Sequence, residues 1–170
     1  MPNENFKFNS VIEKYFGAAE IVEIPSEIDG VPVTKIGDCA FENCNTVKEI
    51  YIPNSVKEIG EYAFWDCRNL QKVHLPKFLK EISNDTFNDC CSLIEINIPD
   101  SVKKIDFQAF FGCHSLIEIY IPDSVEEIGE NAFWNCRNLR KAYINIEKWS
   151  IEKLQKIFDL DDVKILPLVI

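Results

Sequence analysis

Residues 52–74, IPNSVKEIGEYAFWDCRNLQKVH, decide the fold, because close copies of this stretch follow one another along the chain. The next three copies begin at Leu75, Ile98 and Ile121, each 23 residues after the one before. Cysteine and phenylalanine each recur with the same 23-residue period. The cysteines are Cys44, Cys67, Cys90, Cys113 and Cys136, and the phenylalanines are Phe41, Phe64, Phe87, Phe110 and Phe133. The sequence therefore predicts an array of structural repeats.

An Ile-Pro or Leu-Pro pair also marks each repeat, with the prolines at positions 25, 53, 76, 99 and 122. The first gap is five residues longer than the others. We place the extra residues in 26–33, SEIDGVPV, where Asp29-Gly30 and Pro32 indicate a turn.

Within one repeat, residues 70–75 alternate apolar and polar side chains before a proline ends the pattern. This pattern predicts a short strand with Val73 and Leu75 facing inward. A second short extended piece follows at 56–60, and residues 61–64 are expected to form one helical or 3₁₀ turn with Phe64 in the core.

A coil of 23 residues cannot bury its own apolar face, but it can when stacked on its neighbours at about 4.8 Å per strand. We therefore predict an α/β, right-handed solenoid of about five to six coils, with short parallel strands on one face and small helical turns on the other. The whole chain is expected to be a single domain, with repeats over 24–144 and caps at 1–23 and 145–170.

The two ends must close the stack, because an open terminal coil exposes its core. At the front, residues 5–8, 12–15 and 20–24 are expected to be short strands. At the back, Ser150 is a plausible N-cap for a helix over 151–159. The apolar tail, residues 163–170, predicts a last strand.

The repeated string L-x-x-(I/V)-x-(I/L)-P-x-S-V-x-x-I-G-x-x-A-F-x-x-C resembles the treponemal-type leucine-rich repeats of BspA-like proteins. The resemblance covers residues 24–144, five copies deep, and the opening IPSEIDGVPVTKIG is similar to the family's entry into its repeats. The chain departs from the commoner leucine-rich consensus at Ser55, Ser101 and Ser124, where Asn or Cys normally caps the strand.

The resemblance implies a surface or secreted protein that adheres to host matrix proteins or other cells. The polar start MPNENFKFNS does not have the pattern of a signal peptide, so a cytoplasmic location is the alternative expectation.

The chain carries 28 acidic and 18 basic side chains, a formal net charge of −10. This charge disfavours nucleic acid as a partner, because affinity for phosphates rests on Lys and Arg. No apolar run approaches the roughly 18 residues of a membrane span.

The five periodic cysteines are expected to be small buried hydrophobes rather than disulfides or metal ligands. Cys39 and Cys91 fall outside the series and are the expected accessible thiols. A Cys91–His114 pair on adjacent coils is the weaker, catalytic interpretation. Neighbouring carboxylates, Glu95 with Glu118 and Asp66 with Asp89, could hold calcium, although a solvated acidic face is the simpler interpretation.

Two columns of residues, repeated once per coil, are the candidate contact surfaces. On the strand face, Glu49, Lys72, Glu95, Glu118 and Lys141 are followed two residues later by Tyr51, His74, Asn97, Tyr120 and Tyr143. Just after the core phenylalanines run Glu42, Trp65, Asn88, Phe111 and Trp134. Tyrosine and tryptophan give large contact area at low entropic cost, whereas aromatic residues also suit exposed strands and loop packing without any function.

The sequence thus predicts a non-enzymatic binding module that contacts a protein or glycan through Tyr51, His74, Tyr120, Tyr143, Trp65, Phe111 and Trp134, with no cofactor and no metal. A structural or self-associating repeat unit is the alternative. No recognisable catalytic motif supports an enzyme.

Overall fold

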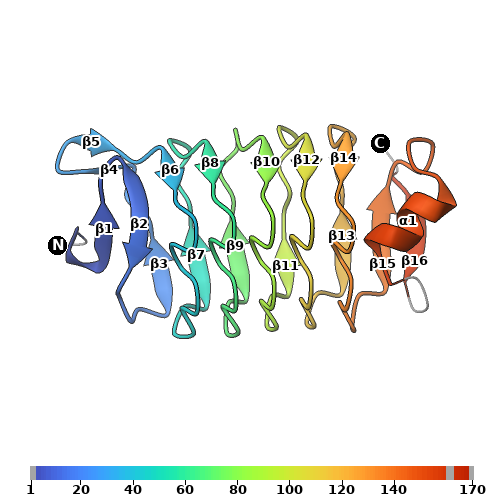
Figure 1. Cartoon of the computed structure of the whole chain (residues 1–170), viewed down its shortest axis with the longest axis horizontal. Coiled ribbons are helices and arrows are strands. Elements are labelled where there is room, and N and C mark those ends of the chain that lie inside the picture. The colour runs from blue at the N-terminus through green and yellow to red at the C-terminus, as the bar shows by residue number, and fades with distance from the viewer. Residues whose placement is uncertain (1–2, 160–162, 169–170) are drawn as a thin grey trace.

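The turns of the chain are stacked along one axis, and the two ends of the chain lie at opposite ends of the stack (Figure 1). This computed structural model describes residues 3–159 and 163–168. The stacked solenoid expected from the repeats is confirmed.

The central turns each carry two short strands, which line up with those of neighbouring turns in two rows. The first row contains β3 (Ile21–Glu23), β7 (Glu49–Tyr51), β9 (Lys72–His74), β11 (Glu95–Ile96), β13 (Glu118–Tyr120), β15 (Lys141–Ile144) and β16 (Lys164–Pro167). The second row contains β1 (Phe6–Phe8), β2 (Val11–Tyr15), β6 (Lys35–Ile36), β8 (Glu58–Ile59), β10 (Glu81–Ile82), β12 (Lys104–Ile105) and β14 (Glu127–Ile128).

Strands from successive turns pair in parallel, at the register that the 23-residue period requires. Glu49 pairs with Lys72 and Ile50 with Val73, so equivalent residues lie side by side. Each row has one interruption. Among the described residues, no strand pairing joins β11 to β13 in the first row or β8 to β10 in the second.

One aromatic ring per turn fills the centre of the stack. The rings stack with centroids 5.0 to 5.3 Å apart, in the order Tyr15, Phe41, Phe64, Phe87, Phe110, Phe133 and Phe158. One ring per turn gives about seven turns in the described part of the chain, more than the five to six expected. The expected number was too low because the first and last intervals, from Tyr15 to Phe41 and from Phe133 to Phe158, depart from 23 residues.

The expected helical turn at residues 61–64 is wrong. Tyr62 and Asp66 have φ angles of +56° and +57°, and these left-handed residues interrupt a helix. Positive φ recurs at the same two places of the other central turns, at Cys39 and Asn43, Asp85 and Asp89, Gln108 and Gly112, and Asn131 and Asn135.

Alternate backbone N–H groups of this segment bond to the next turn, and those between them close tight turns within the segment, as from the Trp65 N–H to the Tyr62 carbonyl. The Phe64 N–H donates to the Thr86 carbonyl at 2.9 Å, and the Phe87 N–H donates to the Ala109 carbonyl at 2.9 Å. Gly112 shows how closely the turns approach, since a Cβ there would collide with Oδ1 of Asp89. Most of the left-handed positions hold Asn, Asp or Gly, which tolerate this conformation best.

The periodic cysteines contribute buried hydrogen bonds as well as volume. The buried thiol of Cys67 donates to the Phe41 carbonyl of the preceding turn, with Sγ 2.9 Å from the oxygen. Cys90, Cys113 and Cys136 repeat this bond at 3.2, 3.3 and 3.1 Å to the carbonyls of Phe64, Phe87 and Phe110. Cys44 is only half-buried, and its thiol lies 3.9 Å from the Glu42 carbonyl instead. Four of the five therefore behave as the sequence predicts.

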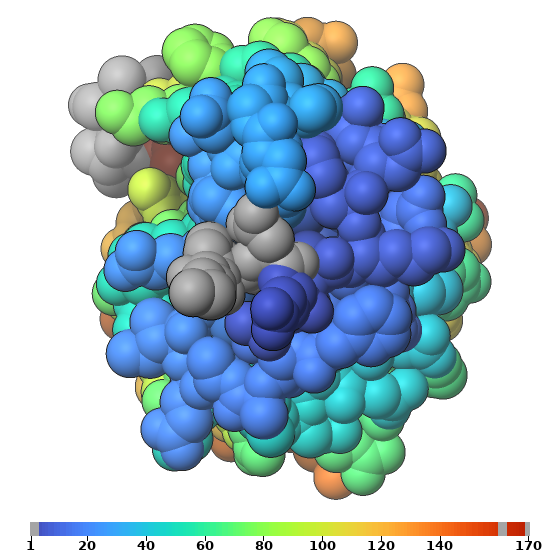
Figure 2. Space-filling model, turned by 90° about the vertical axis from the view of Figure 1, so that its left-hand side faces the viewer, coloured from blue at the N-terminus to red at the C-terminus, as the bar shows by residue number. Residues whose placement is uncertain are grey.

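The first turns differ from the rest in two ways. Strands β1 and β2 pair antiparallel, and the inserted residues form a hairpin of β4 (Glu27–Ile28) and β5 (Val31–Pro32). Asp29 and Gly30 connect the hairpin with φ angles of +53° and +77°, which confirms the expected turn. A 3₁₀ helix, η1 (Asn3–Asn5), precedes β1. Figure 2 shows N-terminal residues, in blue, covering much of this end of the stack.

Helix α1 (Ile151–Ile157) lies at the other end of the stack (Figure 1), where the carbonyls of Lys156 and Ile157 accept hydrogen bonds from the N–H groups of Asn131 and Phe133. Ser150 is its N-cap, with Oγ accepting a hydrogen bond from the Lys153 N–H. The helix ends two residues before the expected boundary, because Phe158 is extended and forms a parallel bridge with Phe133. The expected last strand is β16; residues 169–170 of the expected range lie outside the described residues.

Candidate functional site

The outward side of the first strand row, here called the strand face, brings the predicted columns together. The register places Tyr51 beside His74 and Tyr120 beside Tyr143, while Glu118 lies beside Lys141. We call the residues Tyr51, His74, Asn97, Tyr120 and Tyr143 the ring column, although Asn97 interrupts it.

The first two rings of the column form a hydrogen-bonded stack. The rings of Tyr51 and His74 are 4.0 Å apart at an interplanar angle of 6°. Oε1 of Glu49 lies 2.8 Å from Nε2 of His74 and accepts the Tyr51 hydroxyl at 2.9 Å. These two bonds hold the pKa of the Glu49 carboxyl below its ordinary value, and the bond with His74 has the larger effect. The pair is therefore preorganised rather than free to rotate.

Tyr120 and Tyr143 form the second stack, with rings 4.2 Å apart at 4°. The Tyr120 ring is 51% exposed. A hydrogen bond with Tyr143 raises the pKa of the Tyr120 hydroxyl above its ordinary value. Glu118 beside this pair is held only loosely, with Oε2 at 3.9 Å from Nζ of Lys141.

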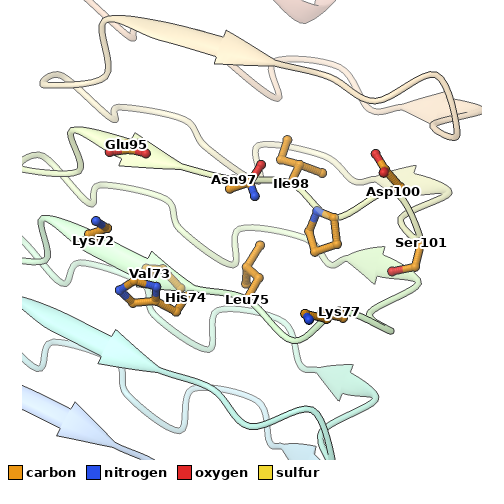
Figure 3. Close-up of a pocket in the computed structure, with 11 residues that line it drawn as sticks. Lys72, Val73, His74, Leu75, Lys77, Glu95, Asn97, Ile98, Asp100 and Ser101 are labelled. Atoms are coloured by element: carbon orange, nitrogen blue, oxygen red, sulfur yellow. The ribbon is translucent and has the colours of Figure 1, made fainter. Parts of the chain in front are cut away.

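Open depressions lie on both sides of the interruption at Asn97, and Figure 3 shows the residues that line the first of them. One of about 630 Å³ is lined by His74, Glu95 and Asn97, with Lys72, Lys77 and Asp100 at its edges. A second of about 550 Å³ is lined by Glu95, Asn97, Ile94, Ile117 and Tyr120, between the unpaired strands β11 and β13. Together they form the most hollowed part of the strand face between the two ring pairs.

The walls of the second depression include two residues that sequence reasoning missed. Ile94 and Ile117 are 51% and 55% exposed, large fractions for isoleucine. Their position holds Lys48, Gln71 and Arg140 in other turns. An apolar residue in an otherwise polar column was the signal that could have revealed them.

The second predicted column consists of the residues just after the core phenylalanines, and we call this part of the surface the turn side. The column is discontinuous. Trp65 and Trp134 are exposed, but Phe111 is half-buried and Asn88 is buried in a hydrogen bond with Asp85. Within the described residues, no ring contact joins Trp65, Phe111 and Trp134. Trp65 instead contacts Tyr62, which the sequence did not single out, with centroids 6.3 Å apart.

The environment of Cys91 opposes the nucleophile that the weaker interpretation needs. Burial and the neighbouring Asp89 raise the pKa of the Cys91 thiol, and Arg68 offsets this only in part. Nε2 of His114 is buried and has no hydrogen-bond partner among the described residues. A catalytic thiol requires a lowered pKa, which is the opposite of the direction found for Cys91.

The two acidic pairs differ in their surroundings. Asp66 accepts from Nε of Arg68 at 2.6 Å, whereas Glu95 and Glu118 line the same depression. The part of the chain that the structure describes contains no group of three or more side chains that could hold a metal ion.

The stacked turns, the parallel strand row and its open face define this molecule as a leucine-rich-repeat solenoid. The model of the BspA type leucine rich repeat region matches residues 19–158 in six copies. The chain therefore belongs to this family, which confirms the resemblance read from the repeats.

Solved structures agree with this assignment. A leucine rich repeat protein of Treponema pallidum, TpLRR, is 34% identical over 86% of this chain and 72% of its own, with a TM-score of 0.83. A leucine-rich repeat protein of Bacteroides ovatus is 30% identical over 84% of this chain, with a TM-score of 0.70, and a leucine rich cell surface protein of Faecalibacterium prausnitzii is 29% identical over 82%, with a TM-score of 0.57.

The chain spans only 44% and 50% of the Bacteroides and Faecalibacterium proteins. A search of the curated proteins gives no match. Among the described residues, no helix is both long and apolar enough to cross a membrane.

Proposed function

We propose that this chain is a non-enzymatic binding module that recognises a protein through its strand face. The observation that carries the proposal is the pair of flat ring stacks on either side of a hollowed interruption, Tyr51 with His74 and Tyr120 with Tyr143, in each of which the tyrosine named first is exposed and its partner is half-buried. Rigid aromatic side chains beside a pocket are the usual anchors of protein interfaces.

The raised pKa of the Cys91 thiol supports binding over catalysis. The Faecalibacterium relative is described as a cell surface protein, which supports a location at the cell surface. The role proposed there is adhesion, with a host matrix or cell-surface protein as the partner. The net charge of −10 favours a partner with a basic contact surface.

The test is a binding screen of the immobilised chain against purified matrix proteins and a glycan array. Any bound partner is then measured with Tyr120→Ala/Tyr143→Ala and with the control Trp65→Ala/Trp134→Ala, which removes two exposed rings from the turn side. We expect the tyrosine variant to weaken binding at least about tenfold, as loss of a hot spot does. Loss only in the tryptophan variant would move the contact to the turn side.

Self-association is the second candidate, because β16 ends its sheet in the described part of the chain and its Ile165 and Leu166 are only half-buried. An unpaired strand edge can take a second copy. Light scattering of the full chain and of a chain cut before Val163 tests this candidate. A monomer mass for both would exclude it.

A further inference from the structure

The interruption of the ring column forms a slot whose two walls are aromatic rings. His74 and Tyr120 lie one turn before and one turn after Asn97, and each stacks with another ring on its far side, so the face toward Asn97 is the free one. Asn97 is exposed and much shorter than a tyrosine, so it forms the floor of the slot.

The width of the slot suits one planar group. Two inter-strand spacings separate the His74 and Tyr120 positions by about 10 Å. The rings of this column stack at 4.0 and 4.2 Å. A flat group placed between His74 and Tyr120 would stack once on each ring, and two stacking distances need about 8 Å. The separation of about 10 Å therefore has room for one such group.

The charge at the slot selects a cation. Glu95 lies on the same strand face two residues before Asn97, and among the described residues it has no hydrogen-bond or ion-pair partner. The equivalent Glu49 is saturated by Tyr51 and His74, whereas Asn97 gives Glu95 no such partner. Glu118, which is only loosely paired with Lys141, adds a second carboxylate, and Lys72 lies beside Glu95 on the neighbouring strand without forming an ion pair with it.

Resting on the proposed function, we infer that this slot receives an arginine side chain of the partner protein, stacked between His74 and Tyr120 and paired with Glu95. A guanidinium is the planar cation of proteins: it stacks on aromatic faces and bonds a carboxylate with two parallel N–H donors. The exposed Ile94 and Ile117 then contact the apolar part of the segment that carries the arginine.

The test uses four capped peptides that differ only at one central residue, which is Arg, Lys, citrulline or Phe. Each is titrated into the full ¹⁵N-labelled chain, and amide shifts are followed by NMR. Citrulline keeps the planar shape without the charge, and Lys keeps the charge without the plane. We expect saturable shifts at residues 94–97 and at His74 and Tyr120, with the Arg peptide binding at least about tenfold more tightly than the other three.

Three variants locate the site. Glu95→Gln removes the carboxylate and should weaken the Arg peptide about tenfold. Asn97→Tyr continues the ring column and should block the slot. Glu127→Gln removes one exposed carboxylate from the second strand row and should leave the Arg peptide's affinity unchanged.

Equal affinity for Arg and Lys, a preference for Phe, or equal losses in Glu95→Gln and Glu127→Gln would each overturn the arginine slot. The proposed function can fail separately. If the Arg peptide binds at Glu95 but no protein in the screen depends on the tyrosines, only the proposed function fails. If a protein depends on the tyrosines but the Arg peptide does not bind, only the arginine slot fails.

Discussion

At the scale of single residues, the core phenylalanine of each central turn fastens that turn in two ways. Its ring stacks on the rings before and after it, and its N–H donates to a carbonyl of the next turn. The ring of Phe87 is fully buried in the middle of the stack. Replacing it therefore leaves a cavity between two turns, with little freedom to collapse.

Phe87→Ala should lower the free energy of unfolding by about 3–5 kcal/mol. The measurement is urea denaturation followed by circular dichroism. The control is Phe78→Ala, which removes a ring that is 56% exposed and covered only by Nζ of Lys57 at 4.4 Å from its centroid. The control should cost less than about 1 kcal/mol. Similar losses for both variants would contradict the role of the ring stack.

The buried thiols make stability depend on alkaline pH. Burial holds the pKa of Cys113 well above its ordinary value, so the folded chain keeps this proton while the unfolded chain releases it above about pH 8.5. The unfolded state then binds fewer protons than the folded state, and the free energy of unfolding falls as pH rises.

Each such thiol contributes a slope of up to about 1.4 kcal/mol per pH unit above this value. Cys113→Ala should therefore show a shallower loss of stability between about pH 9 and about pH 10 than the unchanged chain. Urea denaturation at several pH values measures both slopes. The comparison uses only the slopes of the free energy of unfolding against pH, so the cost of the small cavity left by Cys113→Ala cancels. Identical slopes would mean that the Cys113 thiol ionises in the folded state.

At the residue scale, the 23-residue period was enough to predict which side chains are neighbours. It placed Tyr51 next to His74 and Tyr120 next to Tyr143, and it identified the core phenylalanines. It could not show that Glu49 holds both rings of the first pair, because that depends on side-chain rotamers. Nor did the cysteine spacing reveal the bonds from thiols to carbonyls, which depend on backbone direction.

At the scale of elements, the turn after the second strand shows why a local pattern can mislead. Residues 61–64 contain Ala and Phe beside a Glu, which favours a helical turn when this segment is considered alone. In the solenoid, Tyr62 and Asp66 are left-handed, and the N–H groups of Tyr62, Phe64 and Asp66 donate to carbonyls of the next turn instead of continuing a helix. Tertiary context thus overrides local propensity here.

The break between β11 and β13 was likewise hidden from the sequence. Both turns have the consensus length and pattern, with Glu95-Ile96 and Glu118-Ile119 as matching strand residues. The interruption of pairing depends on how the two neighbouring turns meet and not on the pattern of either repeat. The second depression lies at this break. At the centre of the candidate site, the sequence therefore indicated the residue types but not the depression that they line.

Helix α1 depends on a side-chain cap for its first turn. Oγ of Ser150 accepts from the Lys153 N–H at 3.3 Å, which satisfies one of the N–H groups that a helix start leaves unpaired. Ser150→Ala should cost about 1 kcal/mol, while Ser150→Asp should keep stability within about 0.5 kcal/mol, because aspartate caps as well as serine.

The effect should be local to the helix, so hydrogen exchange of the Lys153 and Leu154 amides is the measurement. Faster exchange in Ser150→Ala and near-normal exchange in Ser150→Asp are expected. Equal acceleration in both variants would indicate that packing of the helix, rather than its cap, sets its stability.

At the scale of the whole molecule, each described turn contacts the turns next to it, as the ring stack from Tyr15 to Phe158 shows. Stability in such a stack is approximately a sum of turn and neighbour-interface contributions. The position of a lost contact along the axis should then decide how far its effect spreads. Phe158 is the last described ring and stacks only on Phe133, whereas Phe87 has rings on both sides.

Phe158→Ala should therefore open one end without loosening the middle. We expect amide exchange to accelerate in α1 and around Phe133, with protection at Phe64 and Phe87 changed by less than about 0.5 kcal/mol. Phe87→Ala should instead lower protection on both sides of the central turn, because its loss divides the stack. Hydrogen exchange followed by NMR compares the two variants residue by residue. A uniform loss along the chain after Phe158→Ala would show that the solenoid unfolds as one cooperative unit, and that neighbour contacts alone do not describe its stability.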